Sequence, residues 1–169
     1  MGDTGYTWAA FEAAEPDFAA VVRERFGQHT HHALATVRKD GSPRLSGIEA
    51  DFRFGELWFG MMPNSRKALD LRRDARFALM ANPGPGTDMG GGDVRVSGRA
   101  VEVTDPETVA RYVEEAGAPQ PFHLFRAEPA EVVRTWVEGE EIVFRTWAPG
   151  RPTRTIRRGN DDSPPRRDP

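Results

Sequence analysis

The segment from Leu57 to Lys67 most constrains what this chain can fold into, because it joins a strand pattern directly to a helix pattern. Its apolar run, Leu57–Met62, is typical of a buried strand and stops at Pro63. The polar corner Asn64–Lys67 then opens into the helical pattern of residues 68–73. Such a corner brings helix N–H groups, a hydroxyl and two cations into one small volume, which is the chemistry that binds a phosphate group. The three side chains concerned are Ser65, Arg66 and Lys67.

The same corner also fits an ordinary helix start, in which Asn64 or Ser65 caps the helix and both cations face water. Cations in a first helical turn oppose the helix dipole, so this alternative carries a small electrostatic cost. Taken by itself, the corner leaves both interpretations open.

The composition is that of one globular domain without covalent cross-links. The chain has 169 residues and no cysteine, so disulfides and thiolate metal sites are excluded. Its net charge of −3 argues against a general nucleic-acid partner, which needs an excess of positive charge. No apolar run reaches the roughly 20 residues that a membrane helix requires, and residues 1–8 lack the pattern of a secretion signal. We therefore expect a cytoplasmic protein with no membrane or nucleic-acid partner.

Alternating apolar residues and hairpin turns predict a mainly β fold. The Asp40-Gly41 pair is a strong hairpin signal, and Gly98 marks an expected bulge. The expected strands cover residues 32–37, 44–54, 57–62, 76–81, 93–103, 122–126, 131–137 and 140–147. Antiparallel neighbours joined by hairpins suggest a small closed barrel with peripheral helices.

Helical spacing and stop signals predict three short helices, over residues 16–26, 65–74 and 104–116. The last is expected to have Thr104 as its N-cap and Glu107 completing a capping box. The glycine-rich segment Asn82–Gly92 predicts a mobile loop. Residues 1–158 are expected to form a single domain, and the polar, proline-containing residues 159–169 a disordered tail.

Other motifs do not amount to a site. His29 and His31 would share a face of an extended chain, but a metal site needs further ligands that no neighbouring motif supplies. No serine has the two flanking glycines of a nucleophile elbow, and no phosphate-loop pattern occurs. We expect no metal and identify no catalytic residue. Trp147, at the end of a strand beside arginine-rich sequence, is a candidate for contact with a planar ligand.

The order of these features resembles that of the pyridoxamine 5′-phosphate oxidase-like, flavin-binding split-barrel family. Residues 33–44 are similar to the family's opening hairpin, and residues 57–67 to the strand that leads into its Ser-Arg-Lys signature. Residues 69–79 resemble the segment after that signature, and residues 93–100 the family's Val-Arg-Val-x-Gly strand. The ordered set covers residues from 32 to 104.

The resemblance implies a six-stranded antiparallel split barrel, a homodimer, and a flavin in a groove between subunits. Arg66 and Lys67 would grip the flavin phosphate with help from Ser65. Backbone groups of residues 44–47 and 60–61 would face the ring and ribityl chain. The full set of implied cofactor-binding residues is Arg44, Leu45, Ser46, Gly47, Gly60, Met61, Ser65, Arg66, Lys67, Arg95 and Trp147.

The predicted function is a flavin-dependent oxidoreductase that binds FMN through its phosphate and acts on an unknown small-molecule substrate. Gly60-Met61 and Asp93 replace the family's Tyr-Thr and Gln, and the His of its C-terminal substrate motif is absent. Pyridoxamine phosphate is therefore not the expected substrate. The phosphate clamp does not distinguish FMN from a 5-deazaflavin coenzyme, so a deazaflavin-dependent reductase is one alternative. A non-catalytic cofactor-binding protein is the other.

Overall fold

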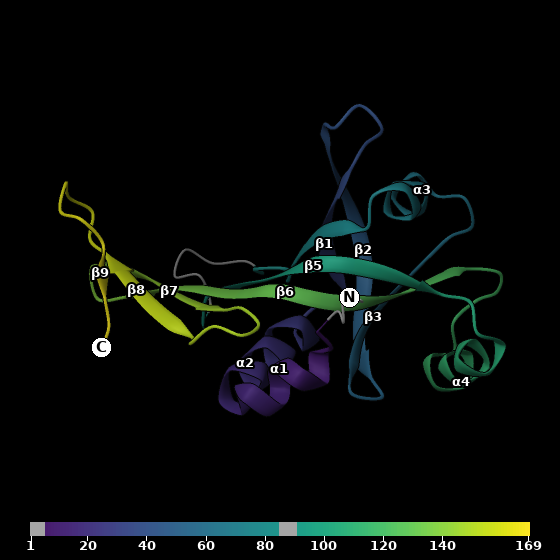
Figure 1. Cartoon of the computed structure of the whole chain (residues 1–169), viewed down its shortest axis with the longest axis horizontal. Coiled ribbons are helices and arrows are strands. Elements are labelled where there is room, and N and C mark those ends of the chain that lie inside the picture. The colour runs from purple at the N-terminus through teal and green to yellow at the C-terminus, as the bar shows by residue number, and fades with distance from the viewer. Residues whose placement is uncertain (1–5, 85–90) are drawn as a thin grey trace.

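The computed structural model of the chain describes residues 6–84 and 91–169 (Figure 1). Its strands are β1 (His31–Val37), β2 (Pro43–Arg53), β3 (Glu56–Met61), β4 (Arg76–Met80), β5 (Asp93–Val103), β6 (His123–Glu138), β7 (Glu141–Trp147), β8 (Arg154–Arg158) and β9 (Arg166–Arg167). Its helices are α1 (Trp8–Ala14), α2 (Pro16–Gly27), α3 (Arg66–Arg73) and α4 (Pro106–Ala116). None of the helices in the described part of the chain is long and apolar enough to cross a membrane. Residues 85–90 of the predicted loop Asn82–Gly92 lie outside the described residues.

Six strands close into an antiparallel barrel. They follow the order β3-β2-β1-β4-β5-β6, and β6 pairs back to β3 from Trp58↔Arg126 to Met61↔His123. The predicted six-stranded antiparallel barrel with short peripheral helices is therefore confirmed. Strands β7, β8 and β9 continue the sheet beyond the barrel as an arm that extends to one side in Figure 1.

Turn chemistry sets the register of β1 and β2. Gly41 has a left-handed φ of 84°, and Asp40 accepts hydrogen bonds from the amide and the hydroxyl of Ser42. This is the hairpin that the Asp-Gly pair predicts. Beyond the turn, alternate side chains of β1, including Leu34, are buried on one face, because successive strand side chains point to opposite sides.

An aromatic cluster joins α1 and α2 to the barrel core. Phe11 of α1 contacts Trp8 at a ring separation of 5.0 Å, Phe18 of α2 at 5.4 Å and Trp147 of β7 at 4.8 Å. Helix α1 is absent from the sequence-based prediction, since its seven residues are too few to show a helical period. A local signal does exist, because Thr7 caps the helix by accepting a hydrogen bond from the Ala10 amide.

Strand β6 is continuous where two strands, 122–126 and 131–137, were expected. Pro129 pairs with Gly98 at a register shift between Ser97 and Gly98, so the predicted bulge at Gly98 is confirmed. A bulge tolerates a proline because the ladder of hydrogen bonds is already interrupted there. Strand β6 can therefore run through Pro129, although a proline in the sequence normally indicates a break between two strands.

The N-terminus of α4 corrects a predicted cap. Its N-cap is Asp105, whose carboxylate accepts from the Thr108 amide at 2.8 Å and from the Thr108 hydroxyl at 2.7 Å. The predicted capping box of Thr104 and Glu107 is wrong. Aspartate is as good an N-cap as threonine, and the proline that follows it is favoured at the first helical position.

Residues 159–169, expected to form a disordered tail, include the short strand β9. Arg166 and Arg167 pair with Arg157 and Ile156 of β8. Arg166 also forms an ion pair with Glu141 at 2.7 Å. Asp168 of the same segment pairs with Arg157 of β8 at 3.0 Å.

Gly98→Ala should destabilise the fold. A Cβ atom on Gly98 would lie 2.0 Å from the Glu128 carbonyl oxygen and 2.8 Å from the Ala130 amide nitrogen, which are backbone atoms. Because β6 must shift to admit it, we expect a loss of roughly 1–3 kcal/mol of unfolding free energy in urea denaturation. Gly47→Ala is the matched control, since a Cβ there meets no atom of the described residues within 4 Å. Equal losses for the two variants would contradict this steric explanation.

Candidate functional site

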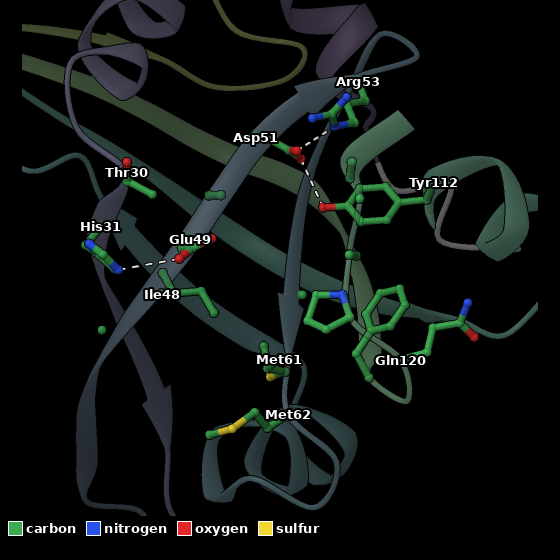
Figure 2. Close-up of a pocket in the computed structure, with 18 of the residues that line it drawn as sticks. Thr30, His31, Ile48, Glu49, Asp51, Arg53, Met61, Met62, Tyr112 and Gln120 are labelled. Atoms are coloured by element: carbon green, nitrogen blue, oxygen red, sulfur yellow. Dashed lines mark hydrogen bonds and ion pairs between the residues drawn. The ribbon is translucent and has the colours of Figure 1, made fainter. Parts of the chain in front are cut away.

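An open groove of about 870 Å³ lies between β2, the end of β3 and α4 with the turn that follows it (Figure 2). Four of the predicted residues line it: Gly47, Gly60, Met61 and Lys67. The others do not: Arg44, Leu45, Ser46, Ser65, Arg66, Arg95 and Trp147. Met62 and the adjoining helix α3 lie at one end of the groove, and Asp51, Arg53 and Tyr112 lie at the other.

The corner before α3 has unused hydrogen-bonding capacity. Ser65 occupies the N-cap position, but its side chain makes no capping bond. Its Oγ is buried and has no hydrogen-bond partner among the described residues. The amides of the first helical turn lack intrahelical acceptors, as in every helix. Because buried polar groups are normally paired, the corner is a place where an anionic ligand would supply missing acceptors.

Lys67 lies where α3 meets the groove. Its Nζ donates a hydrogen bond to the Gly47 carbonyl oxygen at 2.5 Å, and burial lowers the pKa of its ammonium group. One carbonyl engages one of the three donors of an ammonium, so Lys67 can also bind an anion. The first turn contains no acidic residue that would offset its positive charge. Arg66, which was predicted to share this role, is exposed at the surface.

Arg44 anchors α3 to the barrel and does not form part of the groove wall. Its Nε donates to Asp70 Oδ2 at 2.6 Å, and Asp70 also accepts from Thr36 at 2.9 Å and Arg73 at 3.2 Å. Burial alone would raise the pKa of Asp70, but the hydrogen bonds from Arg44, Thr36 and Arg73 outweigh it and lower that pKa. Asp70 is therefore a buried carboxylate that ties α3 to β1 and β2.

Two predicted contacts lie away from the groove. Arg95, on β5, pairs with Glu131 of β6 at 2.9 Å. Trp147 is 5 % exposed and packs on Phe11 of α1 in the core. Because α1 covers the Trp147 ring, this ring packs within the chain.

A hydrogen-bond network that the sequence does not predict forms the far end of the groove. Asp51 accepts from Arg53 Nε at 2.6 Å and from the Tyr112 hydroxyl at 3.2 Å (Figure 2). Glu49 Oε1 lies 3.4 Å from His31 Nε2. Burial, together with the nearby Asp51 carboxylate, raises the pKa of Tyr112, so this phenol remains a hydrogen-bond donor.

Part of this network has a signal in the sequence. Glu49, Asp51 and Arg53 follow Gly47 at every second residue, a spacing that puts them on one face of a strand. Tyr112 has no such signal, because it reaches Asp51 from a helix 61 residues further along the chain.

The comparisons with known proteins identify the family. Residues 18–136 match the family model of pyridoxamine 5′-phosphate oxidase. This match spans more than half of the chain, and the chain belongs to that family. Among curated proteins, no relative matches the sequence significantly.

Solved structures share the fold. A haem-binding protein from Mycobacterium smegmatis aligns with a TM-score of 0.58 at 15 % identity, over 76 % of this chain and 57 % of that chain. HutZ, the haem storage protein from Vibrio cholerae, aligns with a TM-score of 0.52 at 17 % identity, over 75 % of this chain and 91 % of HutZ. PhzG from Burkholderia lata 383, in complex with tetrahydrophenazine-1-carboxylic acid, aligns with a TM-score of 0.50 at 17 % identity, over 94 % and 90 %. Identities this low establish the fold alone.

Proposed function

We propose that this chain is a flavin-dependent oxidoreductase that binds FMN through its phosphate at the corner before α3. The observation that carries the proposal is the unused hydrogen-bonding capacity of the corner, where the buried Ser65 hydroxyl has no partner within residues 6–84 and 91–169 and Lys67 lines an open groove. Membership of the pyridoxamine 5′-phosphate oxidase family supports a redox role.

The residues at this end of the groove fit a phosphate monoester with an attached planar group. Lys67, which lines the groove, supplies a positive charge, and the adjoining corner contributes neutral donors from Ser65 and the first-turn amides of α3. Gly47 leaves the adjoining β2 backbone uncovered, since a Cβ there would meet none of the described residues within 4 Å. A flat ring can therefore approach the backbone closely beside Gly60 and Met61, which line the same groove.

A bound flavin would supply the electron-transfer chemistry, and the chain would bind it, orient it and limit its contact with water. Lys67 and the corner would hold the phosphate end. At the other end, Glu49 and Asp51 offer hydrogen-bond acceptors to a small-molecule substrate. We assign no general acid or base.

We also propose that the chain is a cytoplasmic homodimer whose second copy completes the groove. Large apolar side chains are exposed on the elements that border the corner: Leu45 (75 %), Met62 (76 %) and Leu69 (38 %). Exposed apolar side chains of this size favour a protein contact. Light scattering of the purified chain over a range of concentrations tests this point, and a monomer throughout would contradict it.

Two alternatives use the same residues. A deazaflavin-dependent reductase would bind the phosphate of its coenzyme at the same corner and would transfer hydride. A non-catalytic protein would hold a cofactor in the groove without turnover. Haem also belongs among the ligands to be tested, because two structural neighbours are a haem-binding and a haem storage protein.

The absorption spectrum and the mass of whatever copurifies with the protein distinguish these functions. Bound FMN gives a band at about 450 nm, which should appear on copurification or on titration with FMN. Uptake of a deazaflavin or of haem, with no uptake of FMN, would overturn the proposal. A bound flavin that no electron donor or acceptor can turn over would favour the non-catalytic alternative.

A further inference from the structure

His123 lies directly beside the corner that precedes α3. It is the first residue of β6 and pairs with Met61, the last residue of β3. Its side chain is 15 % exposed, and its Nε2 lies 3.1 Å from the amide nitrogen of Asn64. This bond joins the corner to the barrel wall across 59 residues of sequence.

The partners of the imidazole determine which nitrogen carries its proton. The Asn64 amide can only donate, so Nε2 accepts and carries no hydrogen. Nδ1 lies 3.0 Å from Glu102 Oε1, and hydrogen bonds from Arg72 hold the pKa of Glu102 below its ordinary value. Arg72 Nη2, which can only donate, lies 3.1 Å from the same Nδ1, so it is the Asn64 contact that decides the tautomer. Because Nε2 accepts from Asn64, a neutral imidazole carries its proton on Nδ1 and donates it to Glu102.

Charged groups face His123 from two elements. They are the carboxylate of Glu102 on β5 and the guanidinium of Arg72 on α3. Arg72 is itself held by Glu102 through two hydrogen bonds of 2.7 Å each. The positions of β5, α3 and β6 are thus coupled at this imidazole.

The anchored amide belongs to a residue in an unusual conformation. Asn64 has a left-handed φ of 56°, which residues other than glycine adopt at a cost. The next residue is Ser65, whose buried hydroxyl has no hydrogen-bond partner in the part of the chain that the structure describes. Holding the Asn64 amide fixes the direction in which the chain enters the first turn of α3, and hence the direction of the N–H groups there.

We propose that His123 is a positioning residue for this corner, and that only its neutral form can hold it. Protonation would place an N–H on Nε2 against the N–H of Asn64, so the hydrogen bond would be lost. The phosphate site would then lose its fixed geometry in acid. The ligand in this inference rests on the proposed function; the anchor itself does not.

The test compares FMN with riboflavin, which lacks the phosphate, across the pH range in which histidine changes charge, from about pH 8 to about pH 5. His123→Gln keeps an acceptor that does not titrate, and His123→Leu has none. The phosphate of FMN also titrates at about pH 6, so each variant is compared with the native chain at the same pH.

We expect native FMN affinity to fall about tenfold more than that of His123→Gln between the two pH values, since one hydrogen bond is lost. His123→Leu should bind FMN weakly at both pH values. Riboflavin affinity should not differ among the native chain and the two variants at either pH. His29→Gln, which changes a histidine outside the groove, should keep the native pH profile. Parallel profiles for the native chain and His123→Gln, or tighter native binding in acid, would overturn the proposal.

Hydrogen exchange of the ligand-free chain separates this inference from the proposed function. At about pH 8 the peptide containing Asn64 should exchange faster in His123→Leu than in the native chain, with His123→Gln at the native rate. Unchanged exchange in His123→Leu would refute the anchor whether or not FMN binds. Failure of FMN to bind, with the expected exchange pattern, would refute only the proposed cofactor.

Discussion

Lys67→Met is expected to weaken FMN binding by about 10- to 100-fold while leaving riboflavin binding unchanged. A charge-assisted hydrogen bond to phosphate contributes roughly 1.5–3 kcal/mol, and methionine keeps most of the length and apolar volume of lysine without its charge. Lys67 lines the groove and its ammonium is partly desolvated, so its charge is less screened than that of a surface lysine. Fluorescence titration with the two flavins measures the difference.

The chain contains its own control for this prediction. Lys39 is the one other lysine in the sequence, and it is exposed near the turn between β1 and β2. Lys39→Met should therefore leave FMN affinity unchanged. If Lys67→Met weakens riboflavin and FMN equally, Lys67 supports the groove in a general way and does not bind phosphate. Equal FMN affinity in the native chain and Lys67→Met would remove Lys67 from the site.

Local chemistry made the barrel predictable, whereas the site depends on contacts that no local pattern contains. The Asp40-Gly41 turn and the alternation along the strands indicate hairpins. A series of antiparallel strands joined by hairpins favours a closed barrel. The strand that meets the corner before α3 was predictable for the same reason. Arg44 shows the limit of prediction from local sequence. Its position in β2 follows from the strand pattern, but its pairing with Asp70 depends on how α3 packs against the barrel.

Trp147 illustrates a second kind of limit. Its place at a strand end was consistent with a ligand contact as long as no element covered it. The element that covers Trp147 is α1, which is too short to be predicted from a helical period in the sequence. Because the sequence does not predict α1, it also does not predict that the Trp147 ring is buried in the core. The Tyr112–Asp51 contact was missed for a related reason, since it joins a helix and a strand that only the folded barrel brings together.

Asp70→Asn should cost about 2–4 kcal/mol of unfolding free energy at neutral pH, because it removes the charge that pairs with two arginines. The side chain of Asp70 is 5 % exposed and that of Arg44 is 23 % exposed, so water replaces the lost interaction only in part. Asparagine has nearly the same shape, so the loss reports charge and not packing. Asp74→Asn is the control, because Asp74 pairs with the largely exposed Arg76 and a surface pair contributes little. Urea denaturation at neutral pH measures both variants.

The pH dependence of this difference tests its electrostatic origin. The folded pKa of Asp70 is below its ordinary value, so its stabilising contribution is fully present above the unfolded pKa, about 3.9. It is lost as the pH falls through the lowered folded pKa, since the native chain must then protonate Asp70. The native chain and Asp70→Asn should therefore converge in stability in strong acid and differ most at neutral pH. A difference that stays constant across that range would assign the loss to the amide group's hydrogen-bonding geometry, and would exclude the ion pair as the anchor of α3.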